Sequence, residues 1–196
     1  MISSRAGTPS LRKNLITTKH TMVALVEDKP GVLNRIASMF RRRGFNISSL
    51  AVGHSEMPDL SRMTFVVDGD DATVEQVTKQ LYKLIDVVRV TDLSNEEIVT
   101  REMALVKVRA TAQIRSEIIQ IVDIFRANIV DVSPDTLIIE VTGNEDKIQS
   151  LLEMLKPFGV REVMRTGRVA MIRGGAAPQE GESGRTRRNG SDAQKA

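Results

Sequence analysis

The sequence contains no cysteine and no tryptophan, and its 196 residues include one tyrosine, five phenylalanines and two histidines. Without cysteine, a disulfide scaffold and thiolate chemistry are excluded. The two histidines, His20 and His54, have no second potential ligand nearby in the sequence, so a zinc site or a Ser-His-Asp triad lacks material. No apolar run reaches the roughly 18 residues that cross a bilayer, and the N-terminus has no signal-peptide pattern. We therefore expect a cytoplasmic protein without catalytic residues or metal ligands.

The net charge of the chain is +3, and the excess of positive charge lies at its two ends. The residues between these ends are mildly acidic in sum. Both ends are rich in Gly, Ser, Thr and Pro, and segments of this composition cannot bury enough apolar surface to offset the entropy lost on ordering. The sequence therefore predicts disordered tails at 1–19 and 175–196.

The first half of the body alternates between strand and helix periodicity in the order βαββαβ. Apolar residues alternate in short runs typical of strands, and recur every three or four positions in runs typical of amphipathic helices. Pro30 and Gly31 open the first helix, and Gly44 ends it. The predicted strands cover residues 21–27, 45–54, 61–67 and 86–93.

The same order returns after a polar hinge at residues 94–97. A βαββαβ unit is the ferredoxin-like plait, an antiparallel sheet with both helices on one face. We therefore predict an α+β protein with two such domains, at 20–94 and 95–174. Each unit leaves a sheet face or edge unpaired, so we expect units to pair or the protein to form an oligomer. The strands of the second unit are predicted at 102–109, 129–132, 136–142 and 160–173, and its helices at 114–125 and 144–156.

The plait is also the fold of RNA-recognition modules, which stack bases on aromatic side chains of the two central strands. The predicted strand 61–67 offers only Phe65 for this purpose, and strand 21–27 offers none. The acidic cluster at residues 68–71 lacks the ligand spacing of a metal loop and is typical of a turn with a helix cap. We therefore expect neither nucleic-acid nor metal binding, and a small RNA-binding plait is the alternative from another functional class.

The strand-to-helix junction VEDKPGVL at residues 26–33 has the clearest ligand chemistry. A helix N-terminus presents unpaired N–H groups and a partial positive charge, which suit a carboxylate. Asp28 could accept hydrogen bonds from an ammonium group, and Gly31 lets a ligand approach the backbone closely. Together these groups would bind a zwitterion such as a free amino acid. The alternative is that Asp28 only caps the helix while Pro30 and Gly31 shape the turn, and on spacing alone this is the commoner arrangement.

Several motifs, in order along the chain, resemble one known family. The run HTMVALVEDKPGVLNRIASMFRRRGFNISSLAVGHSE, followed by LSRMTFVV and VTKQLYKLIDVVRV, resembles the N-terminal ACT domain of the acetolactate synthase (acetohydroxyacid synthase) small regulatory subunit. REMALVKVRA and IFRANIVDVSPDTLIIEVTGNEDKIQSLLEMLKPFGVREVMRTGRVAMIRG resemble the C-terminal domain of that family. The resemblance covers about residues 20–174. RRRGFNI, LSRM and FRANIVDVSP are its specific motifs, whereas PGVL is a general ACT signature.

The resemblance implies a protein that has no active site and no cofactor of its own and that regulates a catalytic partner. This partner would be the large catalytic subunit of acetolactate synthase, on which thiamine diphosphate, Mg and FAD are expected. The small subunit is expected to activate it and to make it sensitive to feedback by valine, with leucine or isoleucine as alternative effectors. An ACT sensor that serves a different biosynthetic enzyme is the alternative of the same class.

The resemblance also implies that the effector binds between the ACT domains of a homodimer. The expected effector-binding residues are Asp28, Gly31, Val32 and Leu33 of one chain together with Asn46 and Ile47 of the other. Relatives often have Asn at the position of Asp28. The corresponding junction of the second unit, residues 109–113, has neither the Pro nor the Gly of this turn. We therefore do not expect the second unit to bind an amino acid in the same way.

Overall fold

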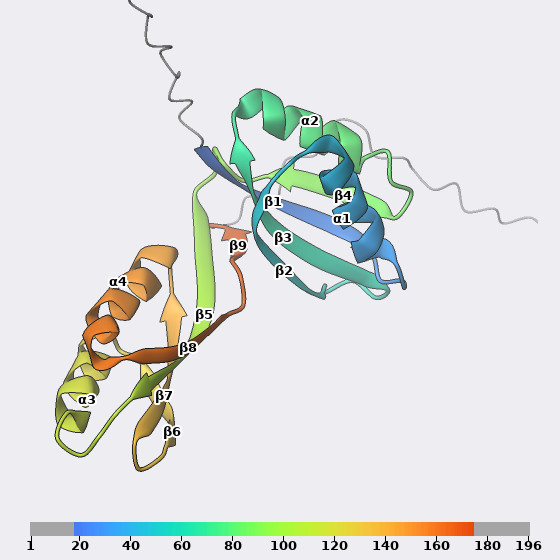
Figure 1. Ribbon diagram of the computed structural model, residues 1–196. Helices are drawn as coiled ribbons and strands as arrows, with labels where there is room; N and C mark the ends of the chain where they lie inside the picture. The colour runs from blue at the N-terminus through green and yellow to red at the C-terminus, as the bar shows by residue number, and fades with distance from the viewer. Residues whose placement is uncertain (1–17, 175–196) are drawn as a thin grey trace, which may run out of the picture.

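The structure, a computed structural model, describes residues 18–174 as two α+β units connected by a long strand (Figure 1). Residues 1–17 and 175–196, which make up nearly all of the two predicted disordered tails, lie outside the described residues. Both units contain the predicted βαββαβ order, so the predicted fold class is confirmed. Within the described part of the chain, no helix is long and apolar enough to cross a membrane.

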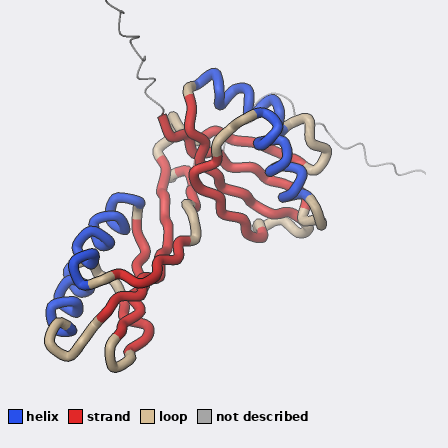
Figure 2. The backbone as a smooth tube through the Cα atoms, viewed as in Figure 1, coloured by secondary structure: helices blue, strands red, loops and turns tan. Residues whose placement is uncertain are grey.

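The first unit consists of β1 (Thr18–Glu27), α1 (Val32–Arg43), β2 (Ile47–His54), β3 (Leu60–Gly69), α2 (Asp71–Leu81) and β4 (Val87–Asp92). Its antiparallel sheet has the strand order β2-β3-β1-β4, which puts β2 and β4 at the edges. Both helices pack on one face of this sheet (Figure 2), and the core lies between the two layers. β1 begins three residues before its predicted start, so Lys19 belongs to a strand and not to the tail.

Helix α1 lies between two glycines whose backbones take the left-handed conformation. Gly31 precedes the helix with a φ of 86°, and Gly44 follows it with a φ of 70°. This conformation is strained for other residues, which explains why glycine marks both ends. The buried face of α1 includes Phe40, whose ring packs edge-on against Phe65 of β3 at a centroid distance of 5.5 Å. The predicted start and stop of this helix are confirmed.

The acidic cluster at residues 68–71 starts helix α2, as the turn-and-cap interpretation predicted. Asp70 is the N-cap residue, and its carboxylate accepts hydrogen bonds from the backbone N–H of Thr73 at 2.9 Å and from the Thr73 hydroxyl at 2.6 Å. These hydrogen bonds lower the pKa of the Asp70 carboxyl. Among residues 18–174, no three His, Asp or Glu side chains are arranged so that they could hold one metal ion.

The second unit consists of β5 (Ile98–Arg109), α3 (Arg115–Ile124), β6 (Asn128–Val132), β7 (Thr136–Gly143), α4 (Glu145–Leu155), the short 3-10 helix η1 (Lys156–Phe158), β8 (Val160–Arg165) and β9 (Val169–Ile172). Its main sheet has the strand order β6-β7-β5-β8. The prediction of one strand over residues 160–173 is wrong, because the chain turns at Gly167, where φ is 84°. β8 pairs with the second half of β5, whereas β9 pairs with residues 98–101 at its start.

Strand β5 connects the two units. It has 12 residues and begins four residues before the predicted strand. Its first residues and β9 form a ribbon that lies against the first unit's sheet (Figure 1). The buried side chains of Val23, Leu93 and Ala170 form the centre of this contact. Successive side chains of a strand point to opposite faces of the sheet. Met22 and Ala24 face the helices, so Val23 between them points to the other face. Part of the sheet face that was expected to be bare is therefore covered by the chain itself.

Candidate functional site

The expected effector site begins at the turn between β1 and α1. Gly31 occupies the N-cap position, and among the described residues no side chain caps the first helical turn. The interpretation that Asp28 caps the helix is therefore wrong. The backbone N–H of Asp28 donates to the carbonyl of Asp59 at 2.8 Å, and its carboxylate lies 3.0 Å from Nδ1 of His54. A helix N-terminus of this kind offers N–H donors and partial positive charge to an anion.

A cation that the sequence did not predict lies next to Gly31. A Cβ atom built on Gly31 would be 3.3 Å from Nη1 of Arg35, one turn further along α1. Nε of Arg35 donates to the carboxylate of the buried Asp86 at 2.6 Å. Positions four residues apart lie on the same face of a helix, so the spacing from Gly31 was the signal that could have identified Arg35. The guanidinium, whose charge is balanced by Asp86, places further N–H donors beside the N-terminus of α1.

Two neighbouring residues of the expected site have different surroundings. The Val32 side chain is 5% exposed and packs in the core, so it holds the helix on the sheet. Leu33 is 47% exposed. Leu33 therefore offers an apolar side chain at the surface beside the N-terminus of α1, whereas Val32 offers its backbone.

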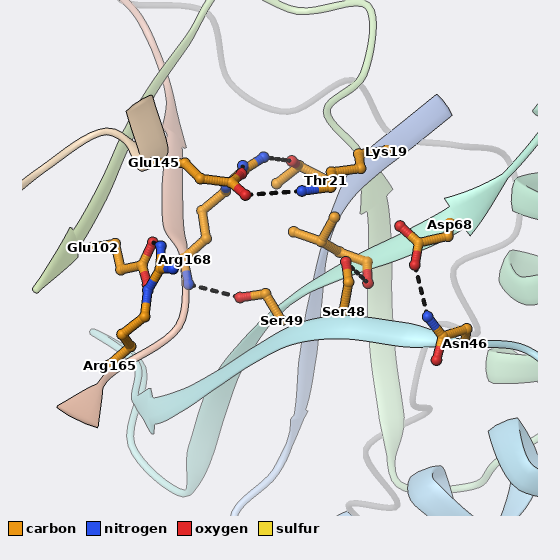
Figure 3. A network of polar contacts seen from close by, with 11 residues as sticks. Lys19, Thr21, Asn46, Ser48, Ser49, Asp68, Glu102, Glu145, Arg165 and Arg168 are labelled. Atoms are coloured by element: carbon orange, nitrogen blue, oxygen red, sulfur yellow. Dashed lines mark hydrogen bonds and ion pairs between the residues drawn. The ribbon is translucent and has the colours of Figure 1, made fainter. Parts of the chain in front are cut away.

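Asn46 and Ile47 lie beyond the other end of α1. The helix has 12 residues, and at 1.5 Å per residue it is about 18 Å long. Nδ2 of Asn46 donates to the carboxylate of Asp68 at 2.6 Å (Figure 3), and Ile47 is half-buried at the start of β2. A single chain therefore does not bring the six expected residues together. It holds four of them near one end of α1 and two near the other.

A cavity of about 340 Å³ lies between the two units, in a place that the sequence did not predict. Figure 3 shows several of the polar side chains that line it. Its walls include Lys19 of β1, residues 48–50 of β2 and the segment 165–168 between β8 and β9. These residues are far apart in the sequence, so no local pattern connects them, and only the fold brings them together.

Five charged side chains line this cavity in two groups. Arg165 donates two hydrogen bonds to the carboxylate of Glu102 on β5, and this contact raises the pKa of Arg165. Glu145, the first residue of α4, accepts hydrogen bonds from Lys19 at 2.8 Å and from Arg168. The hydrogen bond from Lys19 holds the pKa of Glu145 below its usual range. The charged part of the cavity wall therefore consists of three cations paired with two carboxylates, and two of the cations contact the same carboxylate.

Comparisons with known proteins match both units to one family. Residues 22–89 match the AHAS small subunit-like ACT domain, and residues 101–174 match the small subunit of acetolactate synthase. The chain is 54% identical over 155 residues to the acetolactate synthase small subunit of Mycobacterium bovis, which covers 79% of this chain and 92% of that protein. It is 52% identical over 158 residues to the acetolactate synthase small subunit of Mycolicibacterium smegmatis, covering 81% and 93% of the two chains.

A solved structure agrees with these matches. The crystal structure of the acetolactate synthase small subunit from Thermotoga maritima superposes with a TM-score of 0.76 at 48% sequence identity. The superposition covers 81% of this chain and 99% of that one. The chain therefore belongs to the family of acetolactate synthase small subunits.

Proposed function

We propose that this protein activates the catalytic subunit of acetolactate synthase and makes that subunit sensitive to valine. Membership of a small-subunit family supports a larger catalytic partner. In this proposal the partner carries thiamine diphosphate, Mg and FAD, and this chain contributes regulation. The observation that carries the effector part of the proposal is the placement of the six expected residues at the two ends of α1.

A second copy of the chain would unite the two half-sites along the edge strand β2. This strand runs from Ile47, next to Asn46, to His54, which contacts Asp28. Among the described strands, β2 pairs with β3 alone. Residues 167–168 contact it at Ser49 and Leu50, and the rest of its other edge is available for a ladder. If two copies pair antiparallel through this edge, the start of each β2 lies opposite the end of the other. Each half-site then meets its complement, and the dimer holds two identical sites.

The chemistry of each united site suits a small aliphatic amino acid. The N-terminus of α1 and the guanidinium of Arg35 would bind the carboxylate, and Asp28 would accept from the ammonium group. Charge-assisted hydrogen bonds of this kind are worth about 1.5–3 kcal/mol each. Leu33 and Ile47 supply apolar surface for the side chain. Since one methylene changes binding by about 1–3 kcal/mol, a site shaped for valine would bind leucine and isoleucine more weakly.

A site shared by two chains gives the effector a way to act on a third. The effector binds tightly only when the two copies have the relative arrangement that completes the site. Binding therefore stabilises one geometry of the dimer, and a catalytic subunit that contacts the dimer responds to that geometry. In this way, feedback by valine requires no catalytic group on the regulatory chain.

Reconstitution with the catalytic subunit from the same organism tests the proposal. We expect the formation of acetolactate to rise when this protein is added and to fall again when valine is added. Equal rates with and without this protein would contradict the activating role. Activation that valine leaves unchanged would contradict the effector role.

A substitution at Gly31 tests the position of the site. Gly31→Asp places a carboxylate where the ligand carboxylate should bind, so we expect calorimetry to detect no valine binding. Gly159→Asp is the matched control, since Gly159 has a φ of 88° and room for a Cβ atom, and lies in the second unit. It introduces the same side chain at another position with a positive φ. Equal valine binding by both variants would contradict the assignment.

A further inference from the structure

The segment 165–168, which we call the interdomain bridge, contacts β2 beside the expected effector residues. The backbone N–H of Arg168 donates to Oγ of Ser49 at 2.8 Å (Figure 3). A Cβ atom placed on Gly167 would lie 2.7 Å from the carbonyl oxygen of Leu50, so the two backbones touch there. Ser49 lies three residues after Asn46. A displacement of the start of β2 would therefore press on the bridge or release it.

A second route of polar side chains, with a gap between Asp68 and Lys19, leads from Asn46 to the same arginine. Asn46 donates to Asp68 of β3, and Asp68 is the register partner of Lys19 on β1, so these two side chains lie on one face of the sheet. Lys19 donates to Glu145 of the second unit, and Glu145 also accepts from Arg168. Arg168 returns to the first unit through a hydrogen bond from Nη1 to the hydroxyl of Thr21 at 3.2 Å. Both routes therefore converge on Arg168.

The other end of the interdomain bridge is fixed to the second unit. Arg165 binds the buried Glu102 with two hydrogen bonds. The backbone N–H of Thr166 donates to the carbonyl of Met103 at 3.1 Å, and the Thr166 hydroxyl accepts from the N–H of Met103 at 3.1 Å. Glu102 and Met103 belong to β5, the central strand of the second sheet. Because Arg165 and Thr166 bind Glu102 and Met103, a movement of the bridge would also displace β5.

An apolar contact also joins the two units, apart from the interdomain bridge. The ribbon of β5 and β9 packs on the first unit's sheet around Val23, Leu93 and Ala170. The polar contacts of the bridge depend on orientation. The hydrogen bond to Ser49 and the backbone contact at Leu50 form in only one orientation of the second unit relative to β2.

We propose that the interdomain bridge couples effector binding at β2 to the orientation of the second unit, with Ser49 and Gly167 as its positioning residues. The proposal rests on the proposed effector function. The effector stabilises one position of the start of β2, the contacts at Ser49 and Leu50 pass that position to residues 167–168, and the second unit turns against the first. Coupling between two sites amounts to about 5–150-fold in affinity in typical cases.

The first test compares two adjacent serines in the reconstituted enzyme. Ser49→Ala removes the acceptor of the Arg168 N–H, whereas Ser48→Ala removes a hydroxyl that donates to the carbonyl of Val66 inside the first unit. We expect Ser49→Ala to bind valine by calorimetry within about threefold of the wild type and to activate the catalytic subunit normally. We expect its ratio of activities without and with saturating valine to fall about fivefold. Ser48→Ala should keep the wild-type ratio.

A second pair of variants tests the backbone contact. Gly167→Ala introduces a Cβ atom that meets the carbonyl oxygen of Leu50, whereas Gly159→Ala has a similar positive φ and an ordinary contact of 3.8 Å with Arg109. Both positions have a positive φ, 84° at Gly167 and 88° at Gly159, so an effect of the left-handed backbone alone would appear in both. We expect Gly167→Ala alone to change inhibition by valine while it still binds valine.

The outcomes distinguish the coupling proposal from the proposed effector function on which it rests. If the wild type binds no valine, the proposed effector function is overturned and the coupling with it. If the wild type and Ser49→Ala bind valine equally and are inhibited to the same extent, the coupling proposal alone is overturned. Loss of valine binding in Ser49→Ala would also overturn it, because Ser49 would then belong to the effector site.

Discussion

The two units share one topology but finish the first strand-to-helix junction differently. Asp28 and Ala110 are equivalent, because each follows the first strand of its unit and donates its backbone N–H at 2.8 Å to the turn between the next two strands, at Asp59 and Asp135 respectively. The first junction continues through Pro30 and Gly31 and carries a carboxylate at Asp28. The second has a buried alanine at that position.

In the second unit, the side chain of Arg115 fills the junction between β5 and α3. Nη2 of Arg115 donates to the carbonyls of Ala110, Ser133 and Pro134 at 3.0, 2.6 and 2.8 Å. This arginine ties the start of α3 to the turn between β6 and β7. Equivalent positions in one fold can therefore serve as a ligand site in one unit and as a structural joint in the other, since function depends on the residues at the site and not on the fold.

The largest effect is expected where this joint is broken. Arg115→Ala removes the donor shared by three carbonyls, and we expect the free energy of unfolding to fall by about 3 kcal/mol. Denaturant unfolding measures this change, and valine binding should stay as in the wild type. Arg101→Ala is the control, because the exposed Arg101 donates to the carbonyl of the adjacent Thr100. Equal stability of the two variants would show that Arg115 does not join the turn to the helix.

Making the first junction resemble the second should weaken valine binding. Asp28→Ala removes the proposed ammonium acceptor, and we expect a loss of about 2 kcal/mol, or roughly 30-fold in affinity, by calorimetry. Asp28→Asn is the matched control. It keeps a side-chain oxygen as acceptor, so its affinity should lie between those of Asp28→Ala and the wild type. An unchanged affinity in Asp28→Ala would remove Asp28 from the site.

A smaller effect is expected from the apolar part of the site. Leu33→Ala removes exposed apolar surface beside the N-terminus of α1, and we expect valine to bind about fivefold more weakly, or about 1 kcal/mol. Ile124→Ala is the control on the second unit, where Ile124 is 77% exposed at the end of α3. If both variants bind valine as the wild type does, Leu33 makes no contact with the effector.

The smallest effect concerns the ion pairs between the units. Because the folded-state pKa of Glu145 lies below its ordinary value of 4.5, its contribution to stability is present above pH 4.5 and is lost as the pH falls through the folded value. The ion pair of Glu145 with Lys19 is partly exposed. We therefore expect Glu145→Gln to lower the free energy of unfolding by less than about 1 kcal/mol at neutral pH and to leave it unchanged in strong acid. Denaturant unfolding at several pH values checks this.

The order of the elements could be predicted from the sequence because local pattern determines it. Pro30, Gly31 and Gly44 mark the ends of α1, and the acidic turn before α2 follows from Asp70. The break at Gly167 could not be predicted from the sequence, because apolar residues continue on both sides of it and the strand pattern persists. Only the pairing of β8 and β9 with different parts of β5 reveals the break.

Asp28 and Gly31 were predicted as site residues, whereas Arg35 and the residues around the cavity were not. The turn at Asp28 and Gly31 is a local sequence signal. Lys19, Glu145 and Arg168 meet only after both units have folded and docked, so no spacing in the sequence records their contact. The same reason applies to the joint formed by Arg115.

The central claim is that each effector site combines Gly31 of one copy with Asn46 of another, and a subunit-mixing experiment tests it most directly. Gly31→Asp should bind no valine, and Asn46→Ala, which loses one polar contact, should bind it roughly 30-fold more weakly, so neither variant alone gives a signal at a concentration near the wild-type Kd. After the two variants are unfolded together and refolded at equal amounts, half of the dimers carry one copy of each, and one of their two sites is intact. We predict by calorimetry that about one quarter of the wild-type sites return. No return of valine binding in a mixture shown to contain the mixed dimer would contradict a shared site.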